Sequence, residues 1–147
     1  MFESILVCLD GSPMAEQIIP LVKNIVNKKS GKLILLRVVD TTNTQIQSLP
    51  FSRQEDIDNM RGEALNYLKS VAAPLSEKRI NVECQVIQSK PAESIVEFGE
   101  KNRVELIALT THGEGGLGRL VFGSTAVYVL RESKRPTLII KPQRLNR

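Results

Sequence analysis

The segment of residues 111–126, THGEGGLGRLVFGSTA, concentrates the residue types in this sequence that suit the binding of an anion. It holds five of the nine glycines and the single histidine, His112. Glycines let backbone N–H groups approach a ligand, and successive N–H groups form a concave site for phosphate. Gly123, Ser124 and Thr125 stand where a helix is expected to begin, and helix N-termini also attract phosphate. The segment predicts phosphate binding, and a flexible loop before a capped helix is the structural alternative.

Two well-known phosphate motifs fit this segment only in part. Gly113 to Gly118 reads G-x-G-x-x-G, but the dinucleotide motif follows the first strand of its unit and has an acid about twenty residues later. In this sequence, G-x-G-x-x-G follows the fourth predicted strand, and the next strand ends at Ile140-Lys141, where the motif would need an acid. The nucleoside-triphosphate loop needs Lys and then Ser or Thr where Arg119-Leu120 stand. The better pattern is Gly113, nine residues, and then Gly123-Ser124 at a helix start.

The strands and helices that must position this segment alternate along the chain. Short apolar runs predict buried strands at Ile5–Leu9, Leu33–Val39, Val82–Ile87, Leu106–Leu109 and Thr137–Ile140. Apolar residues at helical spacing predict helices from Ser12-Pro13 to a stop at Ser30-Gly31, over the stripe from Ile57 to Leu75, from Pro91 onward, and over Ser124–Glu132. Pro20 lies inside the first helix and is expected to kink it. Residues 41–52 are interpreted as a long irregular loop.

This alternation predicts one α/β domain over residues 1–147, with a doubly wound five-stranded parallel sheet between two layers of helices. The expected strand order is 3-2-1-4-5. Such sheets bind ligands beyond the carboxyl ends of their strands. The polar residues at those ends are Asp10-Gly11-Ser12, Asp40-Thr41, Ser89-Lys90 and Thr110-Thr111-His112-Gly113. We expect a polar rim at this edge, in which Ser12 and Ser89 act only as turn or cap residues.

Composition argues against several classes of protein. Cys8 and Cys84 lack metal-ligand spacing and are expected to be buried free thiols, and one histidine argues against a zinc site. The net charge of +4 owes much to five cations in the last fourteen residues, and the chain has no Trp and two Tyr, so a nucleic-acid surface is not predicted. No apolar run suits a signal peptide or membrane span. We expect a soluble, cytoplasmic protein.

The chain resembles the universal stress protein family over its whole length. The resemblance rests on ILVCLDGSP, LILLRVVD, LIALTTHGEGGLGRLVFGS and RPTLIIKP. The family signature is G-x2-G-x9-G-[S/T]; Gly113, Gly123 and Ser124 match it, whereas Thr110 replaces the first glycine. The Cβ of Thr110 takes room that glycine leaves to a nucleotide, and we interpret this replacement as a tuning change. Members that do not bind nucleotide have lost more of these glycines.

The resemblance implies an adenine-nucleotide site for ATP, ADP or AMP. Asp10 would meet the ribose, with Mg²⁺ held through the phosphates nearby and no direct protein ligand to the metal. The base and ribose would contact Cys8, Leu9 and Val38; the ribose and first phosphates Leu109, Thr110, His112 and Gly113; and the outer phosphates Gly123, Ser124, Thr125 and Arg119. The resemblance also implies a homodimer formed through the edge strand Thr137, Leu138, Ile139 and Ile140. A monomer whose edge is covered by the tail stays open.

Three functions remain open at this stage. The first is a nucleotide-gated dimeric module of the stress response, with a regulatory protein partner and at most slow ATP hydrolysis. The second is an interaction module of the same fold that works without nucleotide. The third is a small enzyme such as an adenylyl transferase, which the lack of a second histidine and of a basic activation motif disfavours. No nucleophile, base and orienting group can be named from the sequence, so a dedicated enzyme is not predicted.

Overall fold

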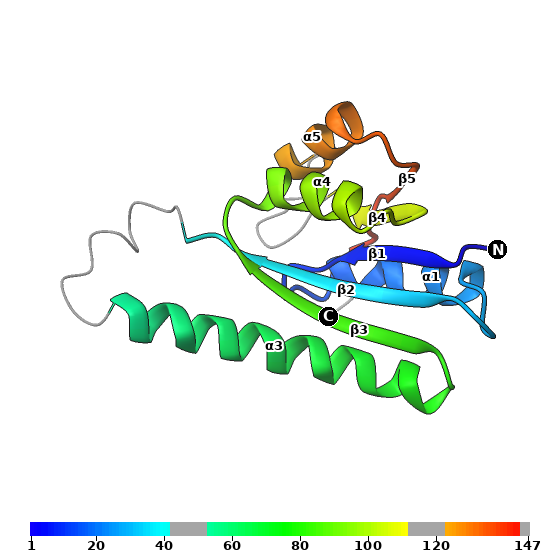
Figure 1. Ribbon diagram of the computed structural model, residues 1–147, viewed down its shortest axis with the longest axis horizontal. Coiled ribbons are helices and arrows are strands. Elements are labelled where there is room, and N and C mark those ends of the chain that lie inside the picture. Colours follow the sequence, from blue (N-terminus) through cyan, green and yellow to red (C-terminus); the bar gives the residue numbers. More distant parts are fainter. Residues whose placement is uncertain (42–52, 112–122, 145–147) are drawn as a thin grey trace.

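The computed structural model describes residues 1–41, 53–111 and 123–144 (Figure 1). Five strands form one parallel sheet in the order β3-β2-β1-β4-β5, as predicted. They are β1 Ser4–Cys8, β2 Lys32–Val39, β3 Asn81–Gln88, β4 Leu106–Thr110 and β5 Thr137–Ile140. The central strands β1, β2 and β4 are mostly buried on both faces, and their sequences are mainly apolar. The carboxyl ends of β1 and β4 therefore meet where the strand order reverses.

Helices cover both faces of this sheet. The 3₁₀ helix η1 (Ala15–Ile18), α1 (Ile19–Ile25) and α3 (Arg53–Glu77) pack on one face, where Val22 and Leu68 join the core with Val7 and Leu35 of the strands. The helices α4 (Pro91–Lys101) and α5 (Ser124–Glu132) pack on the other face, where Ile95 and Val129 contact the opposite sides of the same strands. The apolar stripe predicted for α3 is buried at Ala64, Leu68, Ala72 and Leu75.

The first helical segment differs from the prediction. Its α-helical part starts at Ile19, so Pro20 lies in the first turn and not in the interior. A missing N–H has no cost there, and the predicted kink is wrong. The helix also ends at Ile25, before Ser30-Gly31, because Val26 adopts an extended conformation and forms a parallel bridge with Phe2. The N–H of Phe2 donates to the Ile25 carbonyl at 2.9 Å.

Most of the predicted loop 41–52 lies outside the described residues, which include only Thr41 of it. The predicted limits of the last helix and of the last strand agree with α5 and β5. The α3 helix contains Pro74 near its C-terminal end, a feature that the apolar spacing did not single out.

Candidate functional site

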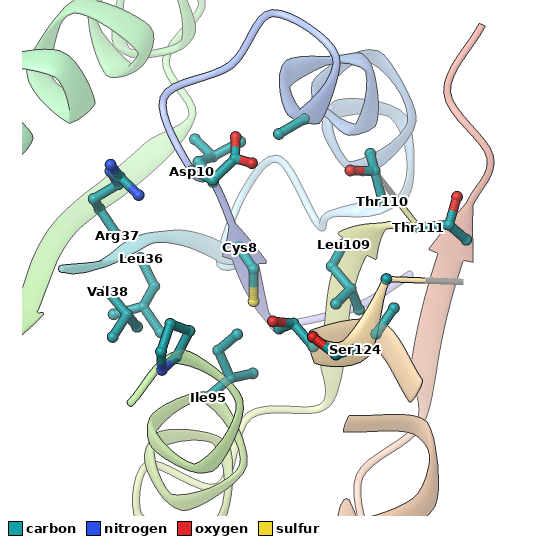
Figure 2. A pocket seen from close by; sticks show the side chains of 16 residues that line it. Cys8, Asp10, Leu36, Arg37, Val38, Ile95, Leu109, Thr110, Thr111 and Ser124 are labelled. Carbon is teal, nitrogen blue, oxygen red and sulfur yellow. The ribbon is translucent and has the colours of Figure 1, made fainter. Parts of the chain in front are cut away.

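A cavity of about 270 Å³ opens at the carboxyl edge of the sheet (Figure 2). The ends of β1, β2 and β4 and the first turns of α4 and α5 contribute to its wall. Nine of the twelve residues predicted to bind nucleotide line it: Cys8, Leu9, Asp10, Val38, Leu109, Thr110, Gly123, Ser124 and Thr125. The other three, His112, Gly113 and Arg119, lie outside the described residues. The structure thus brings together residues separated by more than a hundred positions in the chain.

The turn after β1 fixes the carboxylate of Asp10. The N–H and the hydroxyl of Ser12 both donate to Asp10 Oδ1, at 2.9 and 2.6 Å. Gly11 adopts a left-handed conformation with φ of 90°, which lets the chain turn back toward its own carboxylate. Ser12 Oγ also accepts a hydrogen bond from the N–H of Ala15 at 3.2 Å, so Ser12 is a turn residue, whereas the N-cap of η1 is Met14. Asp10 is held at the cavity with its charge oriented by this turn.

The start of α5 is tied to the end of β4 through Gly123. The Gly123 N–H donates to the Thr111 carbonyl oxygen at 2.8 Å, and a Cβ on Gly123 would lie 2.6 Å from that same oxygen. A glycine is therefore required here by the backbone contact alone. Gly123 is the N-cap of α5, and within the described residues it makes no side-chain capping hydrogen bond to the first-turn N–H groups of this helix.

One side of the cavity is apolar. Leu36, Val38 and Ile95 belong to the buried cluster between the sheet and α4, and Cys8 packs against that cluster. Burial raises the pKa of the Cys8 thiol to about 12, which keeps the thiol neutral at physiological pH. Cys84, on β3, also has its pKa raised by burial, opposed by the nearby charge of Lys69. Both cysteines are free, as expected, but each residue is half-buried and not fully buried.

Figure 2 shows Val38 on one side of the cavity and Thr110 and Ser124 on the other, with Cys8 between them. The lining therefore sets an apolar wall opposite hydroxyl groups and the start of a helix. Asp10 and Arg37 add one negative and one positive charge at the rim. Such a cavity can hold a flat apolar ring against one wall and a polar or anionic group against the other.

Several lining residues were not singled out from the sequence. They are Ala15, Leu36, Arg37, Pro91, Ile95 and Ala126, whereas Thr111 was expected on the polar rim and does line the cavity. Arg37 carried a signal, because it interrupts the apolar run LILLRVV of β2. Conversely, Asp40, Ser89 and Lys90, which were expected on the polar rim, do not line the cavity. Asp40 is exposed, and the N–H of Ser89 donates to the Val39 carbonyl at 3.1 Å.

The described ranges, residues 1–41, 53–111 and 123–144, lack the features of two other classes of site. These ranges contain no group of three or more His, Cys, Asp or Glu side chains that could hold a metal ion. Among their helices, none has the length and apolar character needed to cross a membrane.

The strand predicted to form a dimer lies at the edge of the sheet. Thr137, Leu138, Ile139 and Ile140 of β5 pair in parallel with β4 on one side only, and all four residues are half-buried. Leu138 and Ile140 pack toward the cluster with α1 and α3, whereas Ile139 packs toward the cluster with α4 and α5.

Comparisons with known proteins agree with this architecture. Universal stress protein MJ0531 of Methanocaldococcus jannaschii is 27% identical over 143 residues, which cover 96% of this chain and 83% of that protein. The solved structure of MJ0577, from the same organism, superposes with a TM-score of 0.88 at 28% identity and covers 99% of both chains. A family protein of Arabidopsis thaliana, solved with AMP bound, has a TM-score of 0.65 at 17% identity and covers 95% of this chain and 92% of its own.

The sequence profile of the Universal stress protein family matches residues 1–141, nearly the whole chain. The matched range contains all five strands and the whole cavity lining. The chain therefore belongs to the universal stress protein family.

Proposed function

We propose that this protein binds an adenine nucleotide in the cavity at the carboxyl edge of its sheet. The observation that carries the proposal is the convergence of an apolar wall, the fixed carboxylate of Asp10 and the start of α5 on one cavity. The purine would lie against Val38 and Ile95, because an apolar wall favours a flat aromatic ring. Asp10 would accept a hydrogen bond from a ribose hydroxyl.

The phosphates would lie at the start of α5. Among the described residues, the N-cap Gly123 makes no side-chain hydrogen bond to this helix, and Ser124 and Thr125 of its first turn line the cavity with their hydroxyls. The helix dipole adds a partial positive charge at this end. We assign His112, Gly113 and Arg119 to the same phosphates on the signature alone. Mg²⁺ would be held through the phosphates near Asp10, without a ligand set of its own.

The role that we propose for nucleotide binding is regulatory. Bound and empty forms would differ in their affinity for a protein partner, which requires only differential binding and no chemical step. Two chains would pair through the exposed edge of β5, and hydrolysis of ATP would be slow at most. The AMP-bound structure of the Arabidopsis thaliana protein supports an adenine nucleotide as the ligand of this fold.

A second function deserves a test because of Gly123. Its contact with the Thr111 carbonyl explains the glycine without any phosphate. An interaction module that needs no nucleotide would keep this contact and the same fold. Under this alternative, the cavity would only shape a surface for a protein partner.

The two functions differ in what the purified protein contains and binds. The protein is denatured and removed, and the supernatant is chromatographed for ATP, ADP and AMP; the stripped, refolded protein is then titrated with MgATP and with AMP by calorimetry. We expect released nucleotide or saturable binding. If no nucleotide is released and no binding is seen at millimolar concentration, the proposal is refuted and the interaction module is favoured.

A further inference from the structure

A second hollow lies on the outer side of the domain, between α1 and the C-terminal half of α3. Its volume is about 550 Å³, and none of its lining residues is shared with the cavity at the sheet edge. Tyr67, Ser70, Val71, Pro74, Leu75 and Lys78 line it from one stripe of α3 and the residue that follows the helix. At 1.5 Å per residue, this stripe is about 16 Å long. We call this hollow the α1–α3 groove.

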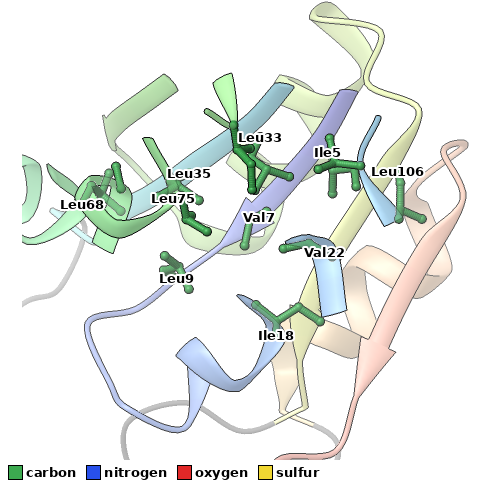
Figure 3. Packing of buried hydrophobic residues seen from close by; sticks show 14 of the residues in the cluster. Ile5, Val7, Leu9, Ile18, Val22, Leu33, Leu35, Leu68, Leu75 and Leu106 are labelled. Atoms are coloured by element: carbon green, nitrogen blue, oxygen red, sulfur yellow. The ribbon is translucent and has the colours of Figure 1, made fainter. Parts of the chain in front are cut away.

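The floor of the α1–α3 groove is apolar. Its apolar lining residues are Ile19 and Pro20 of α1 and Val71 and Leu75 of α3. Figure 3 shows how the floor arises: Leu75 and Leu68 pack on the sheet from the α3 side and Val22 packs from the α1 side, over the same strands. The helices are held apart by this shared core, and the apolar side chains between them line the groove.

Two lysine side chains meet at one end of the groove. Lys23 belongs to α1 and Lys78 follows α3, and both line the groove. The neighbouring Lys78 ammonium lowers the pKa of Lys23, and the charge of Lys28 lowers it further. Cations that converge from separate elements attract an anion between them.

The other end of the groove carries a negative charge and would repel a second anion. Glu16 of η1 lies there and accepts a hydrogen bond from the Tyr67 hydroxyl at 3.0 Å. Residues 16 and 67 mark this end and residues 23 and 78 the other, so the two helices run in the same direction along the groove. A ligand with a negative charge at each end would meet the Glu16 carboxylate. The groove suits a ligand with one anionic head and an apolar body.

We propose that the α1–α3 groove binds a small amphipathic monoanion of the aliphatic carboxylate class. Its carboxylate lies between Lys23 and Lys78, and its chain lies on the apolar floor toward Tyr67. This site is separate from the nucleotide cavity and does not depend on the proposed nucleotide.

Octanoate is a suitable probe, because it carries both a carboxylate and an aliphatic chain. Acetate tests the carboxylate alone, and octanol tests the aliphatic chain without a charge. Isotope-labelled protein is titrated with each probe and the binding is followed by NMR. We expect saturable octanoate shifts at Val71 and Leu75, and at least tenfold weaker binding of acetate and of octanol. No shifts at these residues, or shifts confined to the cavity around Val38, would overturn the proposal.

Substitutions separate the lysine head site from general hydrophobic binding. Lys23→Gln and Lys78→Gln should each weaken octanoate binding about threefold, and the double variant about tenfold, which is the range for solvent-exposed charge pairs. Lys69→Gln, on an exposed α3 position outside the groove, is the matched control and should bind as the parent does. Ser70→Phe should block the groove from its exposed rim. A double glutamine variant that binds octanoate with the parent affinity would refute the site.

Discussion

Ser124→Asp places a carboxylate at the first residue of α5, where we assign the nucleotide phosphates. Ser124 is exposed and lines the cavity, so the larger side chain has room. At about 5 Å, two unit charges repel by about 1 kcal/mol in water and about 3 kcal/mol at the effective dielectric constant of a protein surface. The affinity for AMP should therefore fall by about fivefold to about a hundredfold.

The same substitution should not weaken the fold. An acidic residue in the first turn of a helix stabilises it by about 0.3–1 kcal/mol, because it complements the helix dipole. The free energy of unfolding should stay equal or rise while phosphate affinity falls. These opposite signs distinguish a lost phosphate contact from general damage to the protein.

Calorimetry with AMP, MgATP and adenosine, together with thermal unfolding, measures both effects. Adenosine carries no phosphate, so its affinity should be nearly unchanged in Ser124→Asp. Ser124→Ala is the matched control, which removes the hydroxyl without adding charge and should weaken AMP binding by only a fewfold. Equal AMP affinity in Ser124→Asp and the parent protein would refute the assignment of the phosphates to α5.

Three further predictions concern neighbouring parts of the structure. Gly123→Ala brings a Cβ to 2.6 Å from the Thr111 carbonyl oxygen, so it should lower the free energy of unfolding by about 1–3 kcal/mol. Unchanged thermal unfolding would show that this contact is not tight. Because the pKa of the Cys8 thiol is about 12, Cys8 should react with iodoacetamide at pH 8 about a thousandfold more slowly than an unperturbed thiol, and its rate should increase as the pH rises. Mass spectrometry measures the labelling rate. Labelling of the folded protein at the rate of the denatured protein would contradict this prediction. Ile139→Lys on β5 should convert the proposed dimer to monomer in sedimentation, whereas Ile87→Lys, on the opposite edge strand and packed on the same cluster, is the control that should stay dimeric. A dimer unchanged by Ile139→Lys would exclude pairing through β5.

The sheet could be predicted from the sequence because its signal is local and strong. A strand buried on both faces is a mainly apolar run; β1 and β4 fit this pattern, and β2 fits it from Leu33 to Val39 apart from Arg37. The end of α1 could not be predicted, because Val26 leaves the helical pattern to bridge with Phe2, which lies far from it in the sequence. The apolar spacing includes Val26, but a tertiary contact decides that the helix stops at Ile25.

The cavity was predictable at the strand ends and less so elsewhere. Asp10 and Thr110 follow from topology, since the carboxyl ends of parallel strands share one edge, whereas Val38 was implied by the family resemblance. Ile95 enters the cavity only because α4 packs across the sheet, and its apolar spacing indicates core and not a site. The reason for a glycine at position 123 is likewise tertiary, because it depends on where the Thr111 carbonyl lies.

The most direct test of nucleotide binding in the sheet-edge cavity is a methyl NMR titration of stripped protein with MgATP. Val38, Ile95 and Leu109 line the cavity, whereas Val71 and Leu75 line the separate α1–α3 groove and serve as internal controls. We predict saturable shifts at the first three residues and none at the other two. Unchanged methyl signals around the cavity at millimolar MgATP, or shifts only in the groove, would contradict the account.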